Sequence, residues 1–453
     1  MFKHPLWRFC MFAFIVLSFP FSPYPLTDGD IGNWAPVAQR IQATGQLLSG
    51  INDQSHGPLI VWGSALFLKI APTSYYALNF FNLLCGLLGV ILMYYFSKKL
   101  WHQEGAARLT TYLFVTSLVF VYLSRTPMYD WPATIFYFAF TGFYMLYLRE
   151  DNPKYLGISL ISIAIGSMSR FSICLGLAVI FVFFTSLIYR RSWWLMVRDM
   201  GLISLSIGTL NLPWFLSQTS QNGASFIKTF LYDNTGRFIK STRPHATYRG
   251  DFYGFSLYVL IGILPHTFFV IAAFFNRAFV QKVKEIKLYQ VLLAAFLPCL
   301  ILFSLSGHTK LGRYIAYVFP SLILLLGHYV YSFGLTDPVF RKKCATMTLY
   351  TSGFLGVVLT IMTIQFYQEA QQSLLFVVGV FGLLFSLLWM TYWTVKKSHV
   401  SLRENADRFL WGYAIGYLLF FGILSYESTR ADFLLKVHRT IDKSLVLPGE
   451  IHL

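Results

Sequence analysis

Acidic residues are scarce in this sequence, which has 19 Asp and Glu among 453 residues against 36 Lys and Arg. Charged residues make up 12% of the chain, roughly half of the share usual in soluble domains. Hydrophobic residues make up 56%, aromatic residues 19%, and the mean hydropathy is +0.57. This balance excludes an ordinary soluble domain and predicts an all-α polytopic membrane protein. Despite the net charge of +17, we expect no nucleic-acid partner, because most cations lie in short clusters between apolar runs.

Several chemical motifs are also missing. The five cysteines form no CxxC pair, so we expect neither a disulfide framework nor a cysteine metal site. The histidines do not pair with carboxylates at ligand spacing, so no metal site is predicted, and assistance by a divalent cation stays an open question. The sequence contains no Walker loop, GxSxG elbow or dinucleotide fingerprint, which leaves nucleotide hydrolysis without support.

Long apolar runs predict about 13 membrane-spanning helices. With the amino terminus in the cytoplasm, every inner loop is basic, as the positive-inside rule requires. The carboxyl terminus and two long loops then lie outside, and the first run is a retained helix. Without further targeting signals, we expect a bacterial inner membrane. The predicted spans are residues 6–25, 75–97, 108–124, 131–148, 155–168, 171–189, 195–214, 254–275, 288–306, 314–333, 345–366, 373–394 and 408–426.

Three carboxylates stand at predicted outer boundaries of spans. Asp28 and Asp30 follow the first span in "LTDGDIGNWAPVAQ", and Asp130 precedes a later span in "SRTPMYDWPA". An ionisable group near a membrane is costly and is by default a functional hypothesis. Simpler roles are also open: Asp130 caps the helix that follows it, and Asp28 and Asp30 are solvated or cap an amphipathic interfacial helix near Trp34.

A set of cations lies in the outer segments, where the topology rule does not require them. Arginine binds phosphate through two nitrogens and lysine acts as a point charge, so several of them together suit a lipid-linked phosphate. The alternative is that each side chain reaches to the lipid headgroups. Among the outer histidines, His245 in "RPHATYRGDFYG" is either a surface residue or a substrate contact. The cations are Arg125, Arg170, Arg237, Lys310 and Arg313.

Taken in order, these motifs resemble the GT-C membrane glycosyltransferases. They include "QATG", "HGPLIVW", "GSMSRFS", "LPWF", "DNTGRF" and "HTKLGRYIAYVFP", and they span about residues 6–335. The likeness is greatest to the branch of the lipid A aminoarabinose transferase and the protein O-mannosyltransferases. It implies a GT-C fold with interfacial helices in the first outer loop. It also implies inverting transfer of a sugar from a polyprenyl-phosphate donor to a glycan, lipid or protein acceptor on the periplasmic face.

The resemblance also implies roles for individual residues. The spacing before Gly45 makes Asp30 the base near the acceptor, with Asp28 the second choice, and Asp130 matches a second family acid. The five outer cations are expected on the donor phosphate. Where the family has Lys-Pro, this chain has Gly57-Pro58 beside His56, so one phosphate-contacting lysine is missing. The expected substrate contacts are Trp34, His56, His245, Arg249 and Tyr314.

The predicted domain organisation has three parts. Residues 1–335 form the catalytic core with outer loops 28–74 and 215–251, residues 336–426 add further spans, and residues 427–453 form a short outer tail. A transporter or flippase of lipid-linked sugars is the main rival function, but the charges lie at span ends on one side and no internal repeat is visible. A transferase of the O-antigen-ligase type and a non-catalytic scaffold are two further candidate functions.

Overall fold

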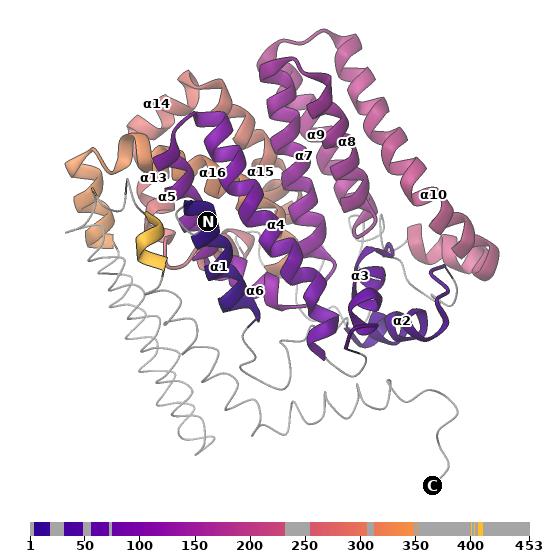
Figure 1. The fold of residues 1–453 in the computed structure, drawn as a ribbon. Helices are drawn as coiled ribbons and strands as arrows, with labels where there is room; N and C mark the ends of the chain where they lie inside the picture. Colours follow the sequence, from indigo (N-terminus) through magenta and orange to yellow (C-terminus); the bar gives the residue numbers. More distant parts are fainter. Residues whose placement is uncertain are drawn as a thin grey trace, which may run out of the picture.

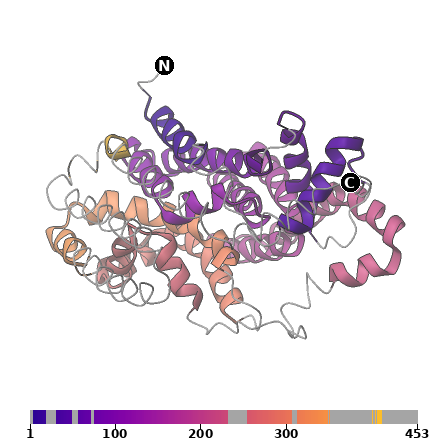
Figure 2. The same cartoon turned by 90° about the horizontal axis from the view of Figure 1, so that it is seen from below.

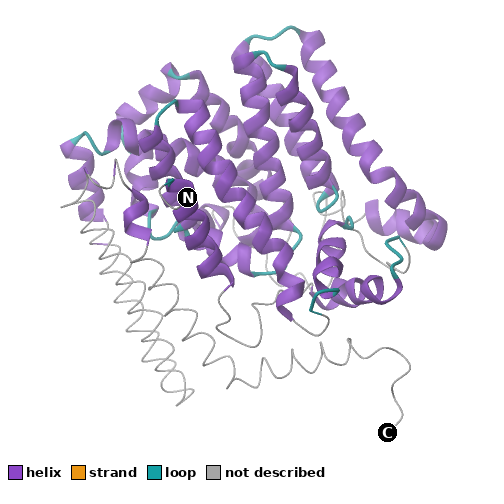
Figure 3. Cartoon of the chain, in the orientation of Figure 1, coloured by secondary structure: helices purple, strands orange, loops and turns teal. Residues whose placement is uncertain are grey.

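The fold is known from a computed structural model, which describes residues 4–18, 31–48, 56–71, 75–231, 254–305 and 312–347, with residues 350, 400, 403 and 406–410. Within these ranges the chain is helical and contains no strand (Figure 3). The all-α fold is therefore confirmed. The elements are α1 (Pro5–Ser18), α2 (Ile31–Thr44), α3 (Leu59–Leu68), α4 (Tyr75–Trp101), α5 (Glu104–Val115), α6 (Leu118–Arg125), α7 (Asp130–Glu150), α8 (Pro153–Ser167), α9 (Phe171–Tyr189), α10 (Trp193–Leu231), α12 (Gly254–Gly262), α13 (Thr267–Phe274), α14 (Arg277–Glu285), α15 (Lys287–Leu305), η2 (Gly312–Val318), α16 (Phe319–Tyr329), η3 (Val330–Gly334) and η4 (Ala406–Phe409).

Five helices are long and apolar enough to cross a membrane: α4, α9, α10, α15 and the continuous segment Arg313–Gly334. A sixth span results if the bent pair α5 and α6 is counted as one. The predicted spans at 345–366, 373–394 and 408–426 lie almost wholly outside the described residues, so the number 13 stays a prediction.

Helices α7, α8 and α9 run up, down and up through the bundle, and this alternation places the start of α7 next to the start of α9 (Figure 1). Local signals set the turns. Helix α7 ends at Asp151 in the left-handed conformation, and Oδ1 of Asn152 accepts a hydrogen bond of 3.0 Å from the backbone N–H of Lys154. Such caps satisfy backbone groups that a helix end leaves without partners.

Two predicted spans are interrupted near their middle. Helices α5 and α6 meet at an angle of 58°, and the segment 254–275 is divided into α12 and α13. The two interruptions lie side by side, because the N–H of Leu118 donates a 2.9 Å hydrogen bond to the carbonyl of Leu264. The donor at one break is thus paired with the acceptor at the other. Backbone groups that are not helical inside a membrane require hydrogen-bond partners of this kind.

Helix α10 is longer than the predicted span 195–214 and continues to Leu231. The first part of the predicted loop 215–251 is therefore helical, with an interruption at Gly223, whose φ is +57°. Beyond this glycine the chain folds back, and the rings of Phe226 and Phe230 lie 5.5 and 6.3 Å from that of Trp214. Aromatic packing outweighs the polar, loop-like composition of this stretch.

The predicted interfacial helix is present as α2. It lies with α3 across one end of the bundle, whereas α14 lies at the other end (Figure 1). Its buried face carries Trp34, Ala38 and Ile41, in helical spacing. Seen from below, helices α12 to α16 follow one side of the earlier helices, whereas η4 lies beside α1 (Figure 2). Among the described residues, the predicted site residues Asp130, Arg170 and His56 lie at the bundle end with α2 and α3.

Candidate functional site

Asp130 and Arg170 form a buried ion pair at the starts of two helices. Asp130 begins α7 and has no exposed surface, and Arg170 directly precedes α9 with 5% exposure. The Nη2 of Arg170 donates a 2.9 Å hydrogen bond to Oδ2 of the aspartate. Burial disfavours the charged guanidinium, but the neighbouring carboxylate more than compensates and raises the pKa of Arg170 above its usual value.

Arg313 adds a second cation to this pair. It lies at the start of the segment 313–334, and its Nε is 3.7 Å from Oδ2 of Asp130. Its guanidinium carbon lies 5.6 Å from the centre of the Tyr314 ring. One carboxylate therefore faces two guanidinium groups, which gives the site an excess of one positive charge. This excess attracts an anion in a region of low dielectric constant.

His56 completes what we call the Asp130 cluster, defined as Asp130, Arg170, Arg313 and His56. The Nη1 of Arg170 lies 2.8 Å from Nε2 of His56. Because arginine can only donate, this imidazole nitrogen is unprotonated and accepts. Both terminal nitrogens of Arg170 are thus engaged, one by the carboxylate and one by the imidazole. Arg170 therefore holds the two side chains in place.

Tyr129 forms an aromatic wall beside the Asp130 cluster. The imidazole of His56 meets its ring edge-on at 4.8 Å, and the guanidinium carbon of Arg170 lies 5.6 Å from its centre. The fully buried ring of Trp34, on α2, contacts the same tyrosine at 6.4 Å. The interfacial helix is thereby joined to the start of α7.

Gly57 fixes the segment before α3 against the turn between α8 and α9. A Cβ atom at this position would lie 2.1 Å from the carbonyl oxygen of Met168, so no larger residue fits without a shift. The same oxygen accepts a 3.1 Å hydrogen bond from the N–H of Leu59. The lysine that the family resemblance leads one to expect at position 57 would have no room in this chain, and the neighbouring His56 points to Arg170.

Arg125 has a different environment from the other described cations. Its Nη1 donates hydrogen bonds of 2.7 and 3.1 Å to the carbonyls of Val16 and Leu17, at the end of α1. These are carbonyls that a helix terminus leaves without intrahelical partners. Arg125 therefore secures the first helix, and its part in phosphate binding stays a prediction.

Other predicted site residues have less or no structural description. Tyr314 is partly buried, and its ring stacks on Phe303 at 6.3 Å. The described ranges contain no group of three His, Cys, Asp or Glu side chains that could hold a metal ion. The predicted residues outside the described ranges are Asp28, Asp30, Arg237, His245, Arg249 and Lys310.

Asp130 and Arg170 each have a buried polar atom with no hydrogen-bond partner within the described part of the chain. These atoms are Oδ1 of Asp130 and Nε of Arg170. Buried polar atoms are normally paired, so each such atom needs an explanation. An acceptor of this kind beside two cations can bind a hydroxyl group.

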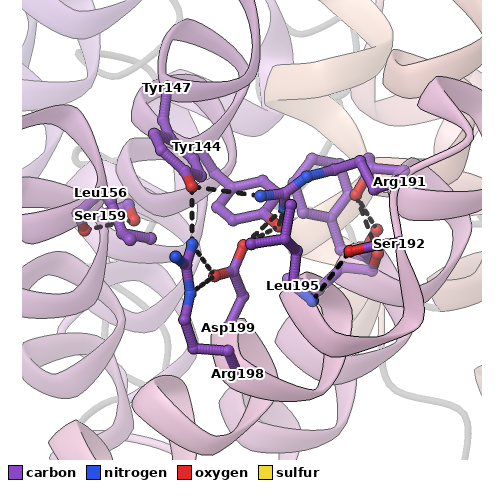
Figure 4. A network of polar contacts seen from close by, with 12 residues as sticks. Tyr144, Tyr147, Leu156, Ser159, Arg191, Ser192, Leu195, Arg198 and Asp199 are labelled. Atoms are coloured by element: carbon purple, nitrogen blue, oxygen red, sulfur yellow. Dashed lines mark hydrogen bonds and ion pairs between the residues drawn. The ribbon is translucent and has the colours of Figure 1, made fainter. Parts of the chain in front are cut away.

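Sequence reasoning did not single out another buried carboxylate, Asp199, whose polar contacts Figure 4 shows. This residue lies in the first two turns of α10, which follows the end of α9 farthest from Arg170. It lies 2.6 Å from Arg191 and 2.7 Å from Arg198, and the hydroxyl of Tyr144 donates a 2.8 Å hydrogen bond to it. Tyr147 binds both arginines, at 3.1 and 2.7 Å. This Asp199 network joins α7 to α10. The available signal was one aspartate among three arginines in "RRSWWLMVRDM".

Comparisons with known proteins bear on the family and the fold of the chain. Residues 55–214 match the family described as dolichyl-phosphate-mannose-protein mannosyltransferase. An undecaprenyl phosphate-alpha-4-amino-4-deoxy-L-arabinose arabinosyl transferase of Pectobacterium atrosepticum is 22% identical over 363 residues, 77% of this chain and 61% of its own length. An uncharacterized protein of Aquifex aeolicus is 22% identical over 335 residues, 73% of this chain and 63% of its own. The chain thus spans under two thirds of these relatives.

The fold also matches a solved structure. ArnT from Cupriavidus metallidurans, bound to undecaprenyl phosphate, superposes with a TM-score of 0.71 at 16% identity, covering 96% of this chain and 77% of that one. Its apo structure gives a TM-score of 0.69. The resemblance to the GT-C membrane glycosyltransferases and the GT-C fold are confirmed.

Proposed function

We propose that this chain, which has the GT-C fold and resembles the lipid A aminoarabinose transferase branch, transfers a sugar from a polyprenyl-phosphate donor. The acceptor is a glycan, a lipid or a protein on the periplasmic face of a bacterial inner membrane. The observation that carries the proposal is the Asp130 cluster. It combines an excess positive charge with a buried carboxylate oxygen that has no hydrogen-bond partner in the described ranges, at one end of the helical bundle.

The donor phosphate is the anion that this charge suits. Arg170 is occupied by Asp130 and His56, so we assign it a positioning role and give the direct contact to Arg313. We propose that Lys310 and Arg237 join Arg313 on the phosphate. Guanidinium and ammonium groups held in a water-poor site stabilise the charge that develops on a departing phosphate.

The reaction proposed is a single displacement. The acceptor oxygen attacks the anomeric carbon, the bond from that carbon to the phosphate oxygen breaks, and the polyprenyl phosphate leaves with the electron pair. The acceptor proton passes to Asp30, or to Asp28 if that is the base. The attack from the opposite side inverts the anomeric configuration. A positioned base of this kind contributes about 10² to 10⁴ in rate.

We assign Asp130 to the sugar rather than to proton transfer. Its Oδ2 accepts from Arg170, whereas the buried Oδ1 has no hydrogen-bond partner among the described residues, and we assign this oxygen to a sugar hydroxyl. Tyr314 offers apolar surface beside Arg313, the buried Trp34 supports the ring of Tyr129, and His56 orients Arg170. We propose that His245 and Arg249 complete the substrate contacts.

The test uses the purified full chain in proteoliposomes, with radiolabelled polyprenyl-phosphate sugars and extracted envelope acceptors. We expect labelled acceptor from wild-type protein and a loss of about 10² to 10⁴ in rate for Asp30→Asn, or for Asp28→Asn if that residue is the base. Asp151→Asn, an exposed position at the end of α7 farthest from Asp130, is the matched control and should stay active. Movement of the labelled donor between leaflets without transfer would instead show a flippase.

A further inference from the structure

Helix α14 lies at the end of the bundle opposite the Asp130 cluster (Figure 1). It is separated from that cluster by the length of α15, whose 19 residues extend about 28 Å at 1.5 Å per residue. The helix is firmly placed. Phe279 is buried and meets the ring of Tyr329 edge-on at 4.8 Å, and Oδ1 of Asn276 caps the first turn by accepting a 2.9 Å hydrogen bond from the N–H of Ala278.

The outward face of α14 borders a hollow of about 430 Å³. The helix lines it with residues at positions i, i+3, i+4 and i+7, which share one face. The end of α13 and the turn after it add two phenylalanines, and Phe275 is 80% exposed. The lining residues are Arg277, Val280, Gln281 and Lys284 from α14, Phe274 from the end of α13, and Phe275 and Asn276 from the turn.

The charges around this hollow are strongly unbalanced. The segment 277–287 contains four cations and one carboxylate, Glu285. That carboxylate is already paired with Lys282 at 2.6 Å and accepts a 2.8 Å hydrogen bond from Gln281. Within the described part of the chain, Arg277 and Lys284 form no ion pair, and both are exposed at the rim of the hollow.

We propose that this hollow binds the headgroup of an anionic glycerophospholipid, with the phosphate between Arg277 and Lys284 and the acyl chains against Phe274 and Phe275. Only an amphiphile contacts both the basic side chains and the exposed phenylalanine rings, because a free phosphate leaves the rings without a partner. Basic residues at a membrane boundary attract anionic lipids, and an amphipathic helix with apolar neighbours lies in that boundary. The site goes beyond the proposed transferase function and does not depend on it.

The test is native mass spectrometry of the full chain, titrated with phosphatidylglycerol or with phosphatidylcholine of the same acyl chains. We expect preferential retention of phosphatidylglycerol. The double substitution Arg277→Gln with Lys284→Gln should weaken its binding about 30-fold, from the loss of two surface charges. The matched control, Lys154→Gln with Arg190→Gln, removes two exposed cations from other turns at the same end and should bind as wild type does.

Three results would overturn the proposal. They are equal retention of the two lipids, an equal loss in the control variant, and displacement of phosphatidylglycerol by millimolar inorganic phosphate, which would indicate a site for free anions. If the double variant does not fold, Phe275→Gln gives an independent measurement at an exposed position. This substitution should lower retention of phosphatidylglycerol while leaving the thermal unfolding midpoint unchanged, and unchanged retention would also contradict the proposal.

Discussion

Replacement of Arg313 by glutamine tests the assignment of the donor phosphate most directly. The change reduces the excess charge of the Asp130 cluster from one to zero. Two unit charges 4 Å apart attract by about 4 kcal/mol at an effective dielectric constant of about 20, and by about 1 kcal/mol in bulk water. The side chain is 12% exposed, which places it between these limits. We expect a loss of about 2 to 3 kcal/mol, so that binding weakens about 30- to 150-fold.

The measurement is the affinity of the purified protein for undecaprenyl phosphate in detergent, together with its thermal unfolding. Arg170→Gln is the comparison, because it removes the 2.9 Å partner of a fully buried carboxylate. Loss of one member of a buried pair costs about 3 to 5 kcal/mol of stability. We therefore expect Arg313→Gln to weaken binding with little loss of stability, and Arg170→Gln chiefly to lower the unfolding midpoint.

Wild-type affinity in Arg313→Gln would refute the reasoning. So would an Arg170→Gln variant that is as stable as the wild type but no longer binds the lipid, because this result would exchange the roles given to the two arginines. Arg313→Lys keeps the charge and loses the planar fork, so partial recovery of affinity is expected.

Three further predictions concern other features. Gly57→Ala should lower the unfolding midpoint through a loss of about 1 to 3 kcal/mol, because its Cβ would meet the carbonyl oxygen of Met168; Gly176→Ala, which has open space around it, should not, and equal midpoints would contradict the close approach. Asp199→Asn should cost about 3 to 5 kcal/mol in thermal unfolding, since two arginines lose their shared carboxylate; affinity for undecaprenyl phosphate should be retained. Treatment with EDTA should leave sugar transfer within about twofold, because arginines supply the positive charge at the proposed phosphate site; loss of activity restored by Mg²⁺ would show a required cation.

The sequence allowed the site's two central charges to be predicted because the topology alternates. Asp130 and Arg170 stand before apolar runs that start on the same side, so both had to lie at one boundary. The distance of 2.9 Å between them depends on how α7 and α9 pack, which no local pattern encodes. Arg125 shows the limit of this reasoning. A cation at the right boundary can serve a backbone carbonyl as well as a ligand, and only the position of α1 reveals which.

Packing between distant segments also explains the remaining differences. The stretch after Trp214 is rich in Ser, Gln and Asn and its composition predicts a loop. It is helical up to Gly223, and after that break a second helical piece packs Phe226 and Phe230 on Trp214. The break between α5 and α6 depends on Leu264, about 150 residues away, whose carbonyl accepts the N–H of Leu118. Neither contact can be predicted from the residues that flank it in the sequence.

A single carboxylate, that of Asp130, links the starts of α7 and α9 to Arg313 and, through Arg170, to the segment before α3. The mutual repulsion of the two guanidinium groups is therefore overcome once, when the chain folds, rather than each time a lipid arrives. A preorganised field of this kind needs little rearrangement at the moment of reaction. For the proposed transferase, capture of the donor should accordingly be limited by lateral diffusion in the bilayer rather than by ordering of the charged residues around it.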